Sequence, residues 1–108
     1  MHTNLIREIN IINHDYRLDI SLEHITEIYG ESLLDHLSDM VEDVVANIKF
    51  LLFLGFGDDV SDICNRFGII LCEDASSFAD RVSALVATIG ADYSTKMGKD
   101  MSRWEALI

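Results

Sequence analysis

Carboxylate side chains at every fourth position form the most unusual chemical pattern in this 108-residue chain. They are Asp15, Asp19, Glu23, Glu27, Glu31, Asp35, Asp39 and Asp43. With Glu42 added and only Arg17 to compensate these charges, residues 15–43 carry a formal charge of −8. Like charges four residues apart on a helix repel by roughly 0.2–0.5 kcal/mol per pair. The pattern therefore has two interpretations: a solvated helix face, or a surface that recognises a basic partner.

Two aromatic residues fall on the same side of a predicted helix as these carboxylates. In a helix over residues 32–54, Phe50 and Phe53 project toward the carboxylate face, so that residues 50–54 are apolar all round. A negative surface beside uncovered aromatic side chains offers a basic protein both electrostatic steering and an apolar anchor. The predicted partner-binding residues are Glu27, Glu31, Asp35, Asp39, Glu42, Asp43, Phe50 and Phe53.

Metal binding and catalysis are competing uses of such side chains, but the spacing favours neither. Helical di-iron sites use Glu-x-x-His pairs, whereas Leu33 stands three residues before His36 and Ser21 three residues before His24. The acidic cluster at 58–62 lacks the glycine that an EF-hand loop requires at its sixth position. No Gly-x-Ser-x-Gly motif is found. We therefore predict no metal, no cofactor, no catalytic residue and no enzymatic activity.

The elements that must position these residues are helices. Apolar residues repeat at helical spacing over about 3–13, 22–29, 32–54, 59–67, 77–89 and 93–104, with Ser21, Asp58 and Ser77 as predicted N-caps. The strongest pattern is the stripe from Leu33 to Leu51. Residues 69–72 are a buried connector or one short strand. The prediction is an all-α fold: a single domain over 1–108, built as a compact bundle of five or six helices around a long central amphipathic helix at about 32–54.

Composition limits the classes of binding partner and the cellular compartment that we predict for this chain. The formal net charge of −11 argues against binding to nucleic acid or to an anionic membrane. Cys64 and Cys72 lie in apolar surroundings and are predicted to be reduced core residues. Without a signal-peptide pattern or an apolar run long enough to span a bilayer, the predicted location is the cytoplasm. Tyr93 and Trp104 keep helical register and are predicted to pack in the core.

Residues 47–91 resemble a single helical repeat of the mitochondrial transcription termination factor family. The residues that carry the resemblance are Ile48, Leu51, Leu52, Leu54-Gly55-Phe56, Val60, Ile63, Phe67, Ile70-Leu71, Phe78, Val82, Leu85, Ile89 and Gly90. The resemblance implies three short helices joined by turns in less than half of the chain. Repeats of that family have a proline where Gly68 stands and bind nucleic acid through basic residues. No functional residue is therefore carried across to this acidic chain.

The sequence thus favours a small acidic protein-binding or regulatory module, of the inhibitor or immunity type, that recognises a basic partner protein. The alternative is a structural homodimer without catalytic activity, in which the apolar segment 50–54 is buried between two copies. A metal-binding protein built around His36 and a nucleic-acid-associated helical repeat are further alternatives.

Overall fold

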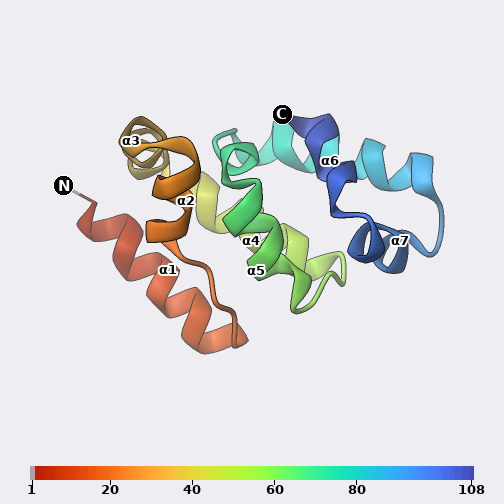
Figure 1. Cartoon of the computed structure of the whole chain (residues 1–108), viewed down its shortest axis with the longest axis horizontal. Helices are drawn as coiled ribbons and strands as arrows, with labels where there is room; N and C mark the ends of the chain where they lie inside the picture. Colours follow the sequence, from red (N-terminus) through yellow and green to blue (C-terminus); the bar gives the residue numbers. More distant parts are fainter. Residues whose placement is uncertain (1) are drawn as a thin grey trace.

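The computed structural model describes residues 2–108, which fold as an all-α protein (Figure 1). The α-helices are α1 (Thr3–Tyr16), α2 (Leu22–Tyr29), α3 (Glu31–Asp39), α4 (Val41–Phe53), α5 (Asp59–Arg66), α6 (Ala75–Ile89) and α7 (Tyr93–Lys99). Two 3-10 helices, η1 (Gly68–Leu71) and η2 (Met101–Leu107), precede α6 and follow α7. Residues 2–108 contain no strand. The predicted all-α class is confirmed.

The predicted long helix over 32–54 is wrong, because the chain breaks at Met40 into α3 and α4. Met40 has φ −135° and ψ 44°, outside the helical region. Its N–H donates to the carbonyl of Leu37 at 3.2 Å, which tightens the end of α3. The N–H of Val44 then donates to the Met40 carbonyl at 3.0 Å, and this bond begins α4. The fold therefore has seven α-helices and no long central one within the described residues.

The break allows two parts of one continuous apolar pattern to meet different neighbours. Leu37 of α3 is buried where α3 lies against α1 and α2, whereas Ile48 and Leu51 of α4 are buried among α1, α5, α6 and η1. At the break, the Cys72 thiol lies 3.7 Å from the Met40 sulfur, so the connector before α6 packs on the corner. One straight helix would place both halves of the stripe in a single direction. Tertiary packing thus overrides a local pattern that contains neither Gly nor Pro at the corner.

Ser21 and two glycines mark other helix ends as predicted, whereas Asp58, at the N-cap position of α5, makes no side-chain capping bond. The Ser21 hydroxyl accepts a hydrogen bond from the N–H of His24 at 3.1 Å and caps α2. Gly30 and Gly90 follow α2 and α6 with φ of 86° and 108°. Glycine tolerates such positive φ angles without the steric cost that other residues incur. Each of these two helix ends could therefore be predicted from a single glycine.

Two other helix boundaries differ from the prediction because side chains bond to the backbone. The side chain of Asn13 bonds both the N–H and the carbonyl of Ile20, each at 2.9 Å. This allows α1 to continue to Tyr16 instead of ending at residue 13. Helix α6 begins directly after Asp74, whose carboxylate accepts from the N–H of Ser77 at 3.1 Å. Asp74 therefore has the N-cap position that the sequence analysis assigned to Ser77.

The core runs through the length of an elongated molecule of 40 × 25 × 24 Å. At the C-terminal end, Trp104 is fully buried, with its ring 5.1 Å from that of Phe56. Tyr93 packs against Phe56 from another side, at 5.6 Å. The predicted core packing is confirmed for Trp104, whereas Tyr93 is half-buried and packs against the edge of the core. The last predicted helix is divided at Asp100 into α7 and η2, and residues 69–71 lie in the 3-10 helix η1.

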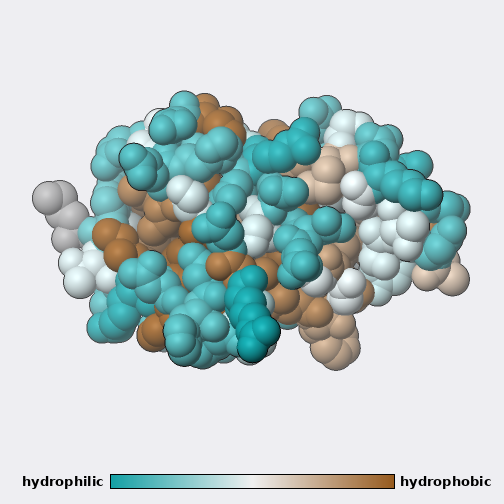
Figure 2. Space-filling view, turned by 60° about the horizontal axis from the view of Figure 1, so that its bottom comes forward, coloured by the Kyte–Doolittle hydropathy of each residue, from teal (hydrophilic) through white to brown (hydrophobic). Residues whose placement is uncertain are grey.

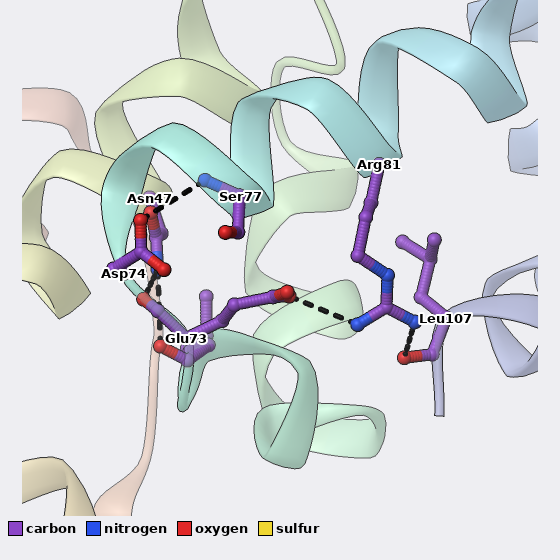
Figure 3. A network of polar contacts seen from close by, with 7 residues as sticks. Asn47, Glu73, Asp74, Ser77, Arg81 and Leu107 are labelled. Atoms are coloured by element: carbon purple, nitrogen blue, oxygen red, sulfur yellow. Dashed lines mark hydrogen bonds and ion pairs between the residues drawn. The ribbon is translucent and has the colours of Figure 1, made fainter.

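A polar network ties α4, α6 and the C-terminal end together (Figure 3). The buried Asn47 amide donates to the carbonyls of Leu71 at 3.1 Å and Glu73 at 2.9 Å. From α6, Arg81 donates to the Glu73 carboxylate at 2.9 Å and to the Leu107 carbonyl at 2.7 Å. These two bonds from the Asn47 NH2 group hold the connector between η1 and α6 in one position, whereas the buried Asn47 Oδ1 has no hydrogen-bond partner among the described residues.

Candidate functional site

The acidic segment, defined as residues 18–45, extends over α2, α3 and the first turn of α4. It contains eight carboxylates and neither Lys nor Arg. All of these carboxylates are exposed except Asp43, which is half-buried. The predicted site residues among them are exposed Glu27 on α2, exposed Glu31, Asp35 and Asp39 on α3, and exposed Glu42 on α4. Because α2 and α3 pack on each other, their charges gather at one end of the molecule, near the N-terminus in Figure 1.

No Lys or Arg in residues 2–108 forms an ion pair with the acidic segment. The ion pairs that Lys and Arg make there are Arg7–Glu8, Arg81–Glu73, Lys96–Asp92 and Arg103–Asp100. All four lie outside the acidic segment. Its carboxylates therefore face solvent without a permanently charged partner from this chain.

One histidine from outside the acidic segment, His2, contacts residues of this segment. His2 lies with Nδ1 2.6 Å from the Ser38 hydroxyl and Nε2 3.4 Å from Asp35 and 3.6 Å from Glu31. The imidazole compensates these carboxylates only when it is protonated. Nothing in the sequence indicates this contact, because residues 29 to 36 positions apart leave no local signal.

Asp43 has a structural role that distinguishes it from its neighbours. Its carboxylate accepts a hydrogen bond from the N–H of Ala75, at 3.0 Å. Ala75 is the first residue of α6, so this N–H has no partner within its own helix. Asp43 therefore caps α6 from α4. Among the predicted acidic site residues, Asp43 is the one whose carboxylate caps another helix.

The two aromatic site residues lie together but differ in exposure. The rings of Phe50 and Phe53 stack with centroids 6.2 Å apart. Phe50 is half-buried and meets the buried Phe78 of α6 edge-on at 6.4 Å. Phe53 is 82% exposed, the highest value among the large apolar residues that are exposed. Phe53 is thus the open part of the pair, and Phe50 supports it from the core.

The solvent-facing stripe of α4 connects the acidic and aromatic features. Glu42, Ala46, Lys49 and Phe53 follow one another at intervals of four, three and four residues, and all four are exposed. At 1.5 Å per residue, about 16 Å of helix separates Glu42 from Phe53. A partner lying along α4 would therefore meet a carboxylate at one end and an aromatic ring at the other. Lys49, between them, was not among the predicted site residues.

The cysteines and possible metal ligands give no second site. Burial raises the pKa of the Cys64 thiol to about 12 and also raises the pKa of Cys72. Such thiols remain protonated at neutral pH, in the form that is a poor nucleophile. Among residues 2–108, no group of three or more His, Cys, Asp or Glu side chains lies close enough together to hold a metal ion.

The fold and surface together define an all-α protein with a strongly acidic end and one exposed aromatic side chain on α4. No protein-family model matches the chain, and no curated protein or solved structure shows significant similarity to it. The resemblance of residues 47–91 to a termination-factor repeat stays a prediction. Of the described helices, none is long and apolar enough to cross a membrane.

Proposed function

We propose that this chain is a protein-binding module, of the inhibitor or immunity type, that recognises a basic surface on another protein. The acidic segment steers and orients the partner, and Phe53 is the apolar anchor. The observation that carries the proposal is the absence of Lys or Arg ion pairs to the acidic segment within residues 2–108. Grouped charges of one sign accelerate encounter with an oppositely charged partner.

The geometry of α4 adds an anchor to this charge. Binding energy in protein interfaces concentrates in a few buried anchors, and aromatic residues are common among them. Phe53 presents its ring to solvent and stacks on Phe50, which in turn meets Phe78 edge-on. A partner with an apolar pocket rimmed by Lys or Arg matches this arrangement.

Affinity capture with three baits tests the proposal. The first bait is the wild-type chain, and the second carries Asp35→Asn, Asp39→Asn and Glu42→Gln. Asp43 is left intact because it caps α6. The third bait carries Asp58→Asn, Asp80→Asn and Glu105→Gln, which remove the same charge from exposed positions outside the acidic segment. Partners are retained at low salt, eluted with a salt step and identified by mass spectrometry.

A basic protein retained stoichiometrically by the first and third baits, but not by the second, supports the proposal. We expect the second bait to bind this protein roughly tenfold or more weakly, because each replaced carboxylate loses steering and contact with a cation. Equal weakening of the second and third baits would show that net charge alone is responsible and would also contradict the proposal. Equal retention by all three would show that these carboxylates do not take part in binding. Either equal retention or no retained partner contradicts the proposal.

The exposed aromatic gives an independent check with the same partner. Phe53→Ala should weaken binding by about 10- to 100-fold, the range for a residue that contributes roughly 1.4–2.8 kcal/mol to an interface. Ile108→Ala, which replaces an exposed isoleucine outside the acidic segment, is the matched control and should leave affinity unchanged.

A further inference from the structure

The outer surface of α1 exposes two isoleucines among polar side chains, on a different helix from the acidic segment and from Phe53. Leu5, Ile9 and Ile12 face the core. On the opposite side, Ile6 and Ile11 border a shallow groove and are 48% and 46% exposed. Figure 2, in which the lower edge of Figure 1 is turned forward, shows hydrophobic surface among hydrophilic side chains on the half of the molecule that contains α1.

Charge distinguishes this surface from the acidic segment. Residues 1–17 contain Arg7 and Arg17 against Glu8 and Asp15, and are formally neutral, in a chain whose net charge is −11. Two copies of so acidic a protein repel each other most strongly across their acidic ends. The outer surface of α1 is an exposed face with apolar residues that a second copy can approach without opposing the charge of the acidic segment.

The spacing along α1 is also self-complementary. Arg7 stands four residues before Ile11, and Asp15 stands four residues after it, about 6 Å along the axis in each direction. All three side chains border the same groove. In an antiparallel pair with the two-fold axis at Ile11, Arg7 of each copy lies opposite Asp15 of the other. Such an isologous contact makes each complementary pair twice.

We propose that the chain forms a weak homodimer through antiparallel packing of α1 on α1 of a second copy, centred on Ile11. One helix face offers a small interface, of the size found in transient complexes. We therefore expect a dissociation constant on the order of 100 µM. The acidic segment and Phe53 are not part of this contact, so the dimer does not depend on the proposed partner-binding function.

Charge exchange across the two-fold axis tests this arrangement by sedimentation equilibrium. Arg7→Asp places two carboxylates opposite each other at both ends of the contact, and Asp15→Arg places two guanidinium groups there. Each single change should weaken the dimer by about tenfold or more, since two favourable pairs become two repulsive ones. The double variant Arg7→Asp/Asp15→Arg restores complementary pairs and should return the dissociation constant to within about threefold of wild type.

The double variant should also keep α1 folded. It moves a carboxylate toward the N-terminus of the helix and a guanidinium toward its C-terminus, the arrangement that the helix dipole favours. Circular dichroism checks that helix content is unchanged. Ile11→Asp should abolish the dimer, whereas Ile28→Asp, which adds the same charge at an exposed isoleucine of α2, should leave it intact.

Three results would overturn the proposal. The first is a wild-type chain that stays monomeric up to about 1 mM, ten times the expected dissociation constant. The second is a double variant no stronger than the single ones, because the contact would then not pair Arg7 with Asp15. The third is loss of the dimer in Phe53→Ser, which would place the contact at the end of α4 instead.

Discussion

The acidic segment and the C-terminal region from Glu73 onward differ in whether Lys and Arg form ion pairs with their carboxylates. In the C-terminal region, Arg81, Lys96 and Arg103 each lie near a carboxylate, at 2.9, 3.2 and 3.9 Å. In the acidic segment, the described structure contains no Lys or Arg ion pair. The C-terminal region pairs opposite charges within the molecule. The acidic segment leaves its carboxylates without such partners. Mutual repulsion in the acidic segment lowers stability, which is expected of a surface that serves recognition.

The aromatic residues show the same division. Trp104 is buried in the C-terminal region against Phe56, whereas Phe53 is open to solvent beside Phe50. Burial of an aromatic ring stabilises the fold, while an exposed ring gains that free energy only when a partner covers it. Buried Trp104 therefore stabilises the fold, whereas the exposed ring of Phe53 is available for binding.

The largest effect should come from breaking this separation at Trp104. Trp104→Ala removes a fully buried ring and leaves a cavity beside Phe56, so the free energy of unfolding should fall by about 3–5 kcal/mol. Urea denaturation followed by circular dichroism measures the loss. Phe53→Ala is the control, and its 82% exposed side chain predicts a change within about 0.5 kcal/mol. Comparable losses in both variants would refute the division.

A smaller effect should distinguish two neighbouring carboxylates within the acidic segment. Asp43→Ala removes the acceptor for the Ala75 N–H and should lower the free energy of unfolding by about 1 kcal/mol, as for the loss of an N-cap. Glu42→Ala removes an exposed carboxylate and should change stability by less than about 0.5 kcal/mol. Thermal or urea unfolding of both variants measures the difference. Equal losses would mean that Asp43 does not cap α6.

Helix ends that depend on a single residue could be predicted from the sequence. The helix break that depends on contacts between distant residues could not. The end of α2 at Gly30 and its cap at Ser21 were predictable, because glycine conformations and N-cap bonds are local. The break at Met40 was not, because it depends on tertiary packing: α3 packs on α2, α4 packs on α5, α6 and η1, and both contact α1. A continuous apolar stripe is compatible with one long helix or with two short ones.

The candidate site divides in the same way. Exposure of Glu31, Asp35 and Asp39 follows from the helical period, which places them opposite the apolar stripe. The contact of His2 with Asp35 and the use of Asp43 by α6 follow from tertiary structure alone. Sequence reasoning grouped Phe50 with Phe53, whereas Phe78 of α6 covers one and leaves the other open.

Salt should reveal the repulsion within the acidic segment. The variant with Asp35→Asn, Asp39→Asn and Glu42→Gln should be more stable than wild type by about 0.5 kcal/mol at low ionic strength, because like-charge pairs are removed. The gain should shrink near 1 M salt, where the Debye length falls to about 3 Å. Urea unfolding at both salt concentrations measures it. The matched variant with Asp58→Asn, Asp80→Asn and Glu105→Gln should gain less, and an equal gain would contradict the comparison.

The smallest effect concerns Asp74, a C-terminal-region carboxylate whose charge serves the fold. Hydrogen bonds from the Ser77 side chain and backbone hold the pKa of Asp74 below its usual 3.8. A lowered folded-state pKa means that the charged form stabilises the native state above pH 3.8. This contribution is lost as the pH falls through the folded-state pKa. Wild type should therefore lose more stability on acidification than Asp74→Asn, in which the amide still caps α6 but does not titrate.

Ser77→Ala makes this last prediction specific. Because the Ser77 side chain is the largest cause of the lowered pKa, its removal should bring the pKa of Asp74 closer to the ordinary value, while the backbone bond to the carboxylate remains. The acid-induced loss of stability from this carboxyl should then be smaller than in wild type and should be complete at a higher pH. Urea midpoints between about pH 6 and pH 2, compared among the three proteins, test it. If Asp74→Asn and wild type lose stability in parallel, the N-cap charge contributes nothing, and the contrast with the acidic segment rests on the ion pairs alone.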